Sequence, residues 1–219
     1  MLMTVRSDQR PASRLERRKT RTRQALIDAA REFLARQGVA EVSIQELTEA
    51  ADVGFGSFYN HFGSKDELFQ AAITDVLEEH GQFLDRLTAD LADPAEVFAA
   101  SVRLTGRMVD THPQMARILS RTGLQYLDSE VGLAPRALRD IRRGIEAGRF
   151  HVTNPIVALA GAGGSLLGFL QVRLAQPGLV DEDACDELAE QVLRMFGMDR
   201  EAAHAVAHLP LPGGSAGTT

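Results

Sequence analysis

The sequence contains a single cysteine, Cys185, among its 219 residues. A lone cysteine cannot form an intramolecular disulfide, and no Cys/His cluster combines the CxxC and HxxxH spacings of a zinc site. We therefore predict no disulfide, no bound metal and no cofactor. The composition fits a reducing, cytoplasmic environment. The N-terminal residues also lead directly into basic sequence, without the apolar stretch that a signal peptide requires.

The sequence also lacks an apolar run of membrane-spanning length. The longest candidate, residues 156–170, has about 15 apolar or small residues, against the roughly 18–20 needed to cross a bilayer. This run is rich in glycine and is followed closely by Gln171 and Arg173. We predict a buried helix here and no membrane partner.

Enzyme signatures are missing as well. The chain has no GxSxG, HExxH or P-loop pattern. Residues 161–166, Gly-Ala-Gly-Gly-Ser-Leu, lack the last glycine of GxGxxG and fall within a helical pattern rather than after a strand. We therefore predict that the protein is not an enzyme.

The charge is distributed unevenly along the chain. The net charge is −6, but residues 1–36 carry ten Lys/Arg against four Asp/Glu, which gives +6 and leaves −12 on the remainder. A basic end on an acidic body is typical of a protein that presents one face to a polyanion. A merely solvated tail explains the charge equally well. Residues 1–18, with dense arginine and no apolar period, are predicted to be a disordered basic arm.

Helical signals follow one another closely from residue 20 onward. Within residues 20–36 the apolar side chains recur at the spacing of one helix face, which predicts a first helix. Gly38 follows the end of this helix. Ser43 and Glu46 form a capping-box pattern that begins a second helix ending near Ala51. Residues 55–62 allow a short third helix, and a second capping box, residues 64–67, opens a long fourth helix that reaches about residue 87.

Proline and glycine mark the helices of the remaining chain. Asp93-Pro94 and Asn154-Pro155 each place a capping side chain before a proline at the first helical position. We predict further helices at about 94–111, after Pro113, 135–148, 155–176 and 181–196, and no strand of useful length. The fold class is therefore all-α. We divide the chain into an arm (1–18), a small three-helix unit (19–65), a larger helical unit (66–200) and a C-terminal tail (201–219).

The three helices within residues 20–62 form the strongest motif. The second and third are joined by a tight turn, as in a helix-turn-helix, where the last short helix lies in the DNA major groove. Residues 42–68, VSIQELTEAADVGFGSFYNHFGSKDEL, closely resemble the TetR-family signature of a threonine-led helix, an Ala-Gly-Val turn, Tyr-x-His-Phe and Lys-x-x-Leu. Asp52 replaces the turn glycine, and aspartate tolerates a positive φ better than most residues. Residues 54–56, Gly-Phe-Gly, also depart from the usual polar pattern.

The resemblance implies a homodimer that binds a palindromic double-stranded DNA operator. The implied phosphate contacts come from side chains around the helix-turn-helix, and the implied base contacts come from the second and third helices. For each residue an ordinary capping, packing or exposed role stays open. The phosphate set is Ser43, Tyr59, His61 and Lys65; the base-reading set is Gln45, Phe55, Ser57 and Asn60; and Arg18 and Arg21 are expected beside the duplex.

The resemblance further implies that the C-terminal domain dimerises and senses a small, largely apolar effector. The fourth helix is expected to transmit effector binding to the DNA-binding domain. An activator, or a helical ligand-binding protein with degenerate DNA binding, stays as an alternative to a repressor. The implied ligand residues are Phe98, Met108, His112, Met115, Leu119, Arg121, Tyr126 and Phe169, and the implied dimer-interface residues are Gly161, Gly164, Gly168, Leu188, Val192 and Met195.

Overall fold

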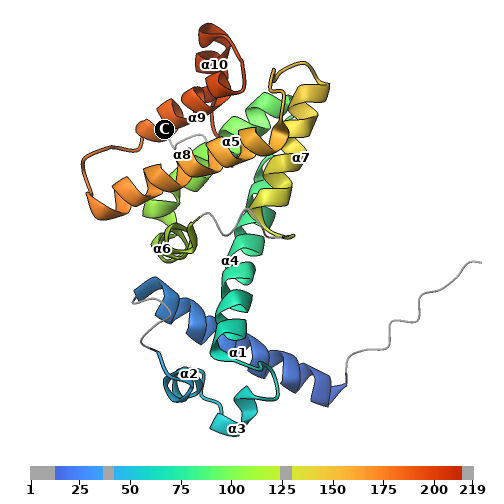
Figure 1. The fold of residues 1–219 in the computed structure, drawn as a ribbon, viewed down its shortest axis with the longest axis vertical. Coiled ribbons are helices and arrows are strands. Elements are labelled where there is room, and N and C mark those ends of the chain that lie inside the picture. Colours follow the sequence, from blue (N-terminus) through green and yellow to red (C-terminus); the bar gives the residue numbers. More distant parts are fainter. Residues whose placement is uncertain (1–12, 37–41, 124–129, 214–219) are drawn as a thin grey trace, which may run out of the picture.

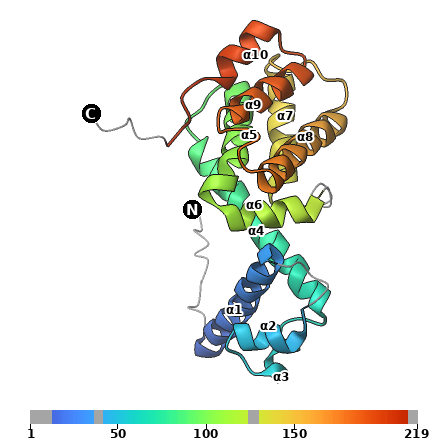
Figure 2. The same cartoon turned by 90° about the vertical axis from the view of Figure 1, so that its left-hand side faces the viewer.

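The computed structural model describes residues 13–36, 42–123 and 130–213, and these residues contain helices and no strands. The prediction of an all-α protein is confirmed. Figures 1 and 2 show a small helical unit at one end and a larger one at the other, with a single long helix running from the first into the second. Tyr126 and most of the predicted arm lie outside the described residues.

The small unit comprises α1 (Arg14–Arg36), α2 (Ile44–Ala50), α3 (Phe55–Phe58) and the first turns of α4 (Lys65–Leu87). These helices pack through side chains that are almost completely buried, including Leu26, Leu47, Phe58, Phe62 and Leu68. α1 packs against both α2 and α4. The helix-turn-helix is therefore held on a small core of its own and on the base of α4.

Two capping side chains set the starts of α2 and α4. The Ser43 hydroxyl accepts from the Glu46 backbone N–H at 3.2 Å, and the Glu46 carboxylate accepts from the Ser43 backbone N–H at 2.8 Å, so the first predicted capping box is present. The second is only half formed. Ser64 accepts from the Glu67 N–H at 3.1 Å, but the Glu67 carboxylate accepts from Gly63 instead, at 2.6 Å.

α1 begins at Arg14 rather than at Thr20, so residues 14–18 of the predicted disordered arm are helical. The cause is a further capping box. The Ser13 hydroxyl accepts from the Glu16 N–H at 3.2 Å, and the Glu16 carboxylate accepts from the Ser13 N–H at 2.5 Å. Residues 13–20 are all exposed, so no apolar period marks this part of the helix in the sequence.

The large unit is arranged around a central helix, α5 (Pro94–Thr111). Around it lie α6 (Pro113–Thr122), α7 (Leu133–Glu146), α8 (Pro155–Ala175), α9 (Ala184–Met195) and α10 (Arg200–Ala207). A cluster of three rings closes the end farthest from the helix-turn-helix. The ring centroids of Phe98 and Phe196 are 4.9 Å apart, and those of Phe150 and Phe196 are 5.0 Å apart.

The predicted C-terminal tail is partly a packed helix. Asp199 caps α10 by accepting from the Ala202 N–H at 2.9 Å, and Ala203, Val206 and Ala207 are buried. Arg103 of α5 donates to the Leu209 carbonyl at 2.6 Å and so holds the chain beyond α10. The sequence concealed this helix because its buried face consists mostly of alanine, which gives a weak apolar signal.

α8 is buried on one side only, so the prediction of a buried helix holds for that side alone. Among the described residues, it is the one helix that is long and apolar enough to cross a membrane by length and composition. In its most apolar 18-residue stretch, 28% of the residues are buried. Ala158, Leu159 and Leu170 face the interior, whereas Ile156 and Val157 are exposed. An unpartnered apolar face therefore remains on this helix.

Candidate functional site

The turn between α2 and α3 aims the short third helix outward. Asp52 has φ +52°, and it is the only non-glycine residue with positive φ among the described residues. The expectation that aspartate takes this conformation is confirmed. The Val53 N–H donates to the Thr48 carbonyl at 3.0 Å, which ties the turn back to α2. Gly54 then caps α3, whose single buried side chain is Phe58.

The outer side of α3 presents aromatic and polar side chains to solvent. Phe55 is 53% exposed and Tyr59 is 57% exposed, and Asn60 is exposed beside them. Tyr59 packs edge-on against the buried ring of Phe58 at a centroid distance of 5.2 Å. Its ring is therefore supported from behind while its hydroxyl stays available. Ser57 is half-buried on the same helix.

The N-terminal turns of α1 add positive charge beside α3. A surface groove is lined on one wall by arginines of α1 and on the other by the turn before α3 and by Ser57. The predicted Arg18 and Arg21 are both in this groove. Its lining residues are Arg14, Arg17, Arg18, Arg21, Thr22, Asp52, Val53, Gly54 and Ser57.

His61, after α3, and Lys65, at the start of α4, are both half-buried. Burial lowers the pKa of His61, and the charges of Lys19 and Arg23 lower it further, so the ring is neutral at pH 7. Its Nδ1 is buried without a hydrogen-bond partner in the part of the chain that is described. The Lys65 ammonium donates to the Val42 carbonyl at 2.9 Å, which joins the start of α4 to the start of α2.

The predicted residues of α2 lie on its exposed side. Ser43 spends its hydroxyl on the cap described above, and Gln45 donates to the Glu49 carboxylate at 2.9 Å within the helix. Both side chains are exposed. Figure 2 shows α1, α2 and α3 at one end of the molecule, opposite the large unit.

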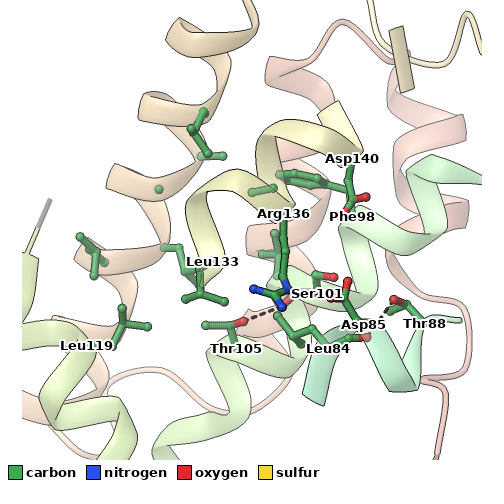
Figure 3. A pocket seen from close by; sticks show the side chains of 17 residues that line it. Leu84, Asp85, Thr88, Phe98, Ser101, Thr105, Leu119, Leu133, Arg136 and Asp140 are labelled. Atoms are coloured by element: carbon green, nitrogen blue, oxygen red, sulfur yellow. Dashed lines mark hydrogen bonds and ion pairs between the residues drawn. The ribbon is translucent and has the colours of Figure 1, made fainter. Parts of the chain in front are cut away.

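The large unit contains an internal cavity of about 80 Å³ between α4, α5, α6, α7 and α8. One water molecule needs about 10–15 Å³ of such space, so the cavity has room for a small organic ligand. In Figure 3 the side chains of Asp85, Ser101 and Arg136 lie close together, and Leu119 lies at the opposite side. The cavity is lined by Leu84, Asp85, Thr88, Phe98, Ser101, Val102, Thr105, Leu119, Leu133, Arg136, Ala137, Asp140, Leu159, Ala162, Gly163, Leu166 and Leu167.

The two cations near the cavity already have carboxylate partners. Arg136 of α7 donates to Glu78 at 2.8 Å and to Asp85 at 2.6 Å, and Arg139 donates to Asp85 and Asp140 at 2.8 Å each. The hydrogen bond from Arg136 is the main cause that lowers the pKa of Glu78 to about 2. Burial raises the pKa of Asp85, but the hydrogen bonds from both arginines outweigh it and lower the pKa overall.

A glycine on α4 makes room for this arrangement. A Cβ atom at Gly81 would lie 2.9 Å from the Arg136 guanidinium, closer than side chains normally approach. Arg136 therefore lies directly over the α4 backbone. A larger residue at position 81 would push the guanidinium away from Glu78 and Asp85.

The hydroxyl groups of the cavity wall donate to their own helices. Thr88, Ser101 and Thr105 donate to the carbonyls of the residues four positions earlier, at 2.9, 2.8 and 2.7 Å. Because the Thr105 hydrogen is used in this way, the contact of 2.9 Å to His80 Nε2 requires the imidazole to donate. Burial lowers the pKa of His80 to about 4, with a smaller contribution from His112, so the ring stays neutral. The wall thus offers hydrogen-bond acceptors.

Of the predicted ligand residues that the structure describes, only Phe98 and Leu119 line the cavity. Met108 and Met115 are buried but belong to the packed core, and Phe169 packs near Gly106. His112 is exposed between α5 and α6. The prediction favoured large apolar residues, whereas Asp85, Arg136 and Asp140 supply the polar part of the wall. The spacing of Arg136 and Asp140, four residues apart on α7 beside Leu133 and Ala137, was the signal that the sequence offered.

Arg121, also predicted to bind the ligand, instead joins the two units. Its guanidinium donates to the carbonyl of Leu34 and, at 3.1 Å, to that of Arg36, at the C-terminal end of α1. These carbonyls have no partner within the helix, and a cation is favourable there. Leu119, two residues earlier on α6, lines the cavity. α6 therefore contacts both the cavity and the helix-turn-helix unit.

The predicted dimer residues divide into two groups. Leu188 and Val192 are buried inside the protomer, against the prediction that they form the interface. Their heptad-like pattern reflected the packing of α9 on α5. Gly164 and Gly168 of α8 are exposed with open space around them, and the exposed Met195 lies against Gly161, where a Cβ atom would be 3.0 Å from the Met195 sulfur.

Comparison with known proteins agrees with this architecture. A family model described as "Tetracyclin repressor-like, C-terminal domain" matches residues 93–209, and one described as "Bacterial regulatory proteins, tetR family" matches residues 26–72. The crystal structure of RolR without ligand superposes with a TM-score of 0.72 at 35% identity, over 87% of this chain and 98% of that chain. RolR in complex with the ligand resorcinol gives a TM-score of 0.66 at 33% identity, over 90% and 97%.

Two curated relatives are transcriptional repressors. The HTH-type transcriptional repressor NicS of Pseudomonas putida is 26% identical, over 66% of this chain and 65% of its own length. The probable acrEF/envCD operon repressor of Escherichia coli is 23% identical, over 86% of this chain and 92% of its own length. With a helix-turn-helix on one unit and the two family models covering both, the chain belongs to the tetR family of bacterial regulatory proteins and is a DNA-binding transcription regulator.

Proposed function

We propose that the protein is a homodimeric repressor that leaves its operator DNA when a small aromatic molecule with hydroxyl groups binds in the cavity between α4 and α8. The observation that carries this proposal is the acceptor-rich wall of that cavity. Each half of the function has its own support in the residues described above.

The DNA-binding half rests on the exposed surface of α1, α2 and α3. We propose that Ser43, Tyr59, His61 and Lys65 contact phosphates and that the α1 arginines of the groove follow the adjacent backbone. We further propose that Gln45 of α2, Phe55 and Ser57 of α3, and Asn60 just after α3 meet base edges. Phe55 suits a thymine methyl group, because it is an exposed apolar ring on the helix expected in the groove.

The chemical class of the effector follows from the hydrogen-bonding state of the wall. Asp85 and Asp140 are carboxylates, and the hydroxyls of Ser101 and Thr105 have already donated their hydrogens. A ligand that brings O–H donors satisfies these acceptors, whereas a ligand carboxylate would be repelled by them. The remaining wall is apolar and suits an aromatic ring. Resorcinol, the ligand of the similar RolR, is an aromatic ring with two hydroxyl groups.

The switch runs from the cavity to α1 through two elements. α4 carries Leu84 and Asp85 at the cavity and Lys65 at the DNA-binding surface. α6 carries Leu119 at the cavity and Arg121 on the end of α1. A ligand that shifts either helix changes the spacing of the two α3 helices in a dimer, which must match about 34–36 Å between successive major-groove half-sites. Coupling of this kind is typically worth about 1–3 kcal/mol.

The experiment compares three ring compounds on the full-length protein. A palindromic duplex is first selected from random DNA, and its release is followed by fluorescence anisotropy. We expect resorcinol to release the DNA, whereas 1,3-dimethoxybenzene, which lacks O–H donors, and benzoate, which is an anion, have little effect. Equal release by all three compounds would contradict an acceptor-rich effector site. Failure to select any duplex would contradict the DNA-binding half.

A matched pair of variants locates the effector. Thr105→Val keeps the side-chain shape but removes the wall hydroxyl, and Thr111→Val removes an exposed hydroxyl that donates to its own helix in the same way. We expect the first variant to bind resorcinol about tenfold more weakly, the scale of one hydrogen bond to a buried group, and the second to match the parent protein. Equal affinities would place the effector elsewhere.

A further inference from the structure

A cluster of metal-binding side chains lies outside both surfaces described so far, where α10 packs on α9. Glu190 of α9 and His204 and His208 of α10 each offer one ligand atom, and these atoms all lie within 4.8 Å of one another. The sequence prediction of no metal site overlooked this group, because it considered cysteine and histidine together. The spacing His204-x-x-x-His208 is itself a metal-binding pattern on a helix.

The two histidines lie on one side of α10. Residues four apart are neighbours on a helix surface, and the ring centroids of His204 and His208 are 4.1 Å apart. The buried side chains of Ala203, Val206 and Ala207 fix the opposite side of α10 against the protein. The position of both imidazoles is therefore set by a packed helix rather than by a loop.

A hydrogen bond also selects the tautomer of His208. Its Nδ1 atom is 2.9 Å from the His204 carbonyl, which can only accept, so this nitrogen carries the hydrogen in the neutral ring and Nε2 keeps its lone pair. The Nδ1 atom of His204 is 2.8 Å from a Glu190 carboxylate oxygen, so a metal ion bound by both residues takes the place of the hydrogen between them. Histidines that bind metals in proteins usually have their other nitrogen held by a carbonyl or a carboxylate, as in His208.

We infer that Glu190, His204 and His208 form a binding site for a divalent transition-metal ion of the zinc, nickel or copper class. Imidazole is a preferred ligand of these ions, and the Glu190 carboxylate compensates part of the positive charge. The side chain of His204 is 63% exposed, so water fills the remaining coordination positions. A bound ion joins α9 to α10 and stabilises the C-terminal end of the fold.

The charged neighbours of the cluster offer a competing ligand class. Glu187, Gln191, Arg194 and Arg200 line the same surface depression as the three metal-binding residues. The two arginines suit an anion, whereas the two imidazoles and the Glu190 carboxylate suit a cation. We favour the cation, because the possible ligand atoms of Glu190, His204 and His208 all lie within 4.8 Å of one another.

Titration calorimetry of the full-length, EDTA-treated protein tests the site with zinc chloride and, separately, with inorganic phosphate. We expect one zinc ion per protomer and a rise in the unfolding temperature when zinc is present. His204→Ala and His208→Ala are each expected to weaken zinc binding by at least about tenfold, the usual cost of disturbing a metal site. His151→Ala removes an exposed histidine outside the cluster and should leave zinc binding unchanged.

Two further measurements keep the result interpretable. Circular dichroism of each metal-free variant checks that α10 still folds. If an alanine variant does not fold, Glu190→Gln replaces it, because this variant keeps a hydrogen-bond acceptor for His204. Copper-loaded protein should show nitrogen hyperfine splitting in its electron paramagnetic resonance spectrum, lost in the double histidine variant. Zinc binding that survives in that double variant, or binding of phosphate but not zinc, would overturn the inference.

Discussion

Single side chains around the helix-turn-helix fall into those that hold the fold and those that remain free to bind. The Lys65 ammonium holds the Val42 carbonyl, and Ser43 holds the start of α2. Tyr59, in contrast, has its ring supported by Phe58 and its hydroxyl exposed. Tyr59 is therefore the best position at which to measure the energy of a DNA contact, because its hydroxyl makes no hydrogen bond within the described residues.

Tyr59→Phe should weaken DNA binding without altering sequence preference. The variant keeps the ring and loses one hydrogen bond to a charged phosphate, which is worth about 1.5–3 kcal/mol, or roughly tenfold or more in the dissociation constant. The loss should be similar for the selected operator and for unrelated DNA, because phosphate contacts carry no sequence information. Anisotropy titrations on both duplexes measure this. Asn60→Ala is the contrasting variant, expected to change the ratio between the duplexes.

His80 makes stability depend on pH through its burial. Its pKa is about 4 in the folded protein, against an ordinary value of 6.5. Between pH 4 and pH 6.5 the unfolded chain binds a proton at this residue and the folded protein does not. The contribution of His80 to the free energy of unfolding is therefore full above pH 6.5 and falls as the pH drops toward 4. We expect a loss of about 2 kcal/mol between pH 7.5 and 5 from this residue.

His80→Gln checks that assignment, because glutamine does not titrate and retains an N–H donor for Thr105. Urea unfolding at several pH values between 7.5 and 5 should show a flatter profile in this variant than in the parent protein. His151→Gln, at an exposed position, should keep the parent profile. Parallel profiles for the parent and His80→Gln would show that another group causes the pH dependence.

Among the elements, α6 contacts both the cavity and the helix-turn-helix unit, which is why we propose it as a coupling element. It is a short helix that begins at Pro113, directly after α5. Leu119 lies at the cavity, and Arg121 contacts the end of α1. α4 is the second connection, and Figure 1 shows it running without a break from the small helical unit into the large one. From the sequence we expected α4 to transmit effector binding to the DNA-binding domain, and we expected only ligand contacts from α6.

Arg121→Ala should separate effector binding from DNA release. Without the guanidinium, movement of α6 no longer acts on the Leu34 and Arg36 carbonyls, so resorcinol should still bind while its effect on DNA affinity shrinks by about 1 kcal/mol or more. Calorimetry with resorcinol and anisotropy with operator DNA measure the two quantities. Arg117→Ala, an exposed arginine on the same helix, serves as the control. An unchanged DNA response would leave α4 as the sole connection.

The whole molecule has one basic end and one uncovered apolar face. The arginines of α1 lie at the end that carries α3, and the exposed side of α8 lies on the large unit. A soluble protein covers an apolar face of this kind with a partner, and a second copy of the chain supplies the same face through a two-fold axis. We therefore propose that α8, with Met195 beside it, forms the dimer interface.

Val157→Glu should dissociate the dimer. Val157 is 66% exposed in the protomer, and a glutamate there would place two like charges in the interface near the two-fold axis. Light scattering after size exclusion should show a monomer, and affinity for a palindromic duplex should fall. Leu179→Glu changes a residue that is 62% exposed in the loop between α8 and α9 and is expected to leave the dimer intact. A dimeric Val157→Glu variant would place the interface elsewhere.

The sequence by itself determined the helical fold and the location of the helix-turn-helix. Capping residues, prolines and short-range apolar spacing act over a few residues, so Ser43 with Glu46, the Asp52 turn and the starts of α5 and α8 were all readable. The first helix and α10 were misjudged, because exposed arginines and small alanines give no apolar period.

Only the tertiary structure decided which side chains meet across the large unit. Asp85, Thr105 and Arg136 come from three helices, and their meeting at one cavity depends on the packing of α4, α5 and α7. The packing of α9 on α5 buried Leu188 and Val192 inside the protomer, whereas Ile156 and Val157 of α8 remained exposed. Apolar spacing shows that a helix has a face to bury, but not whether that face packs within the chain or against a partner.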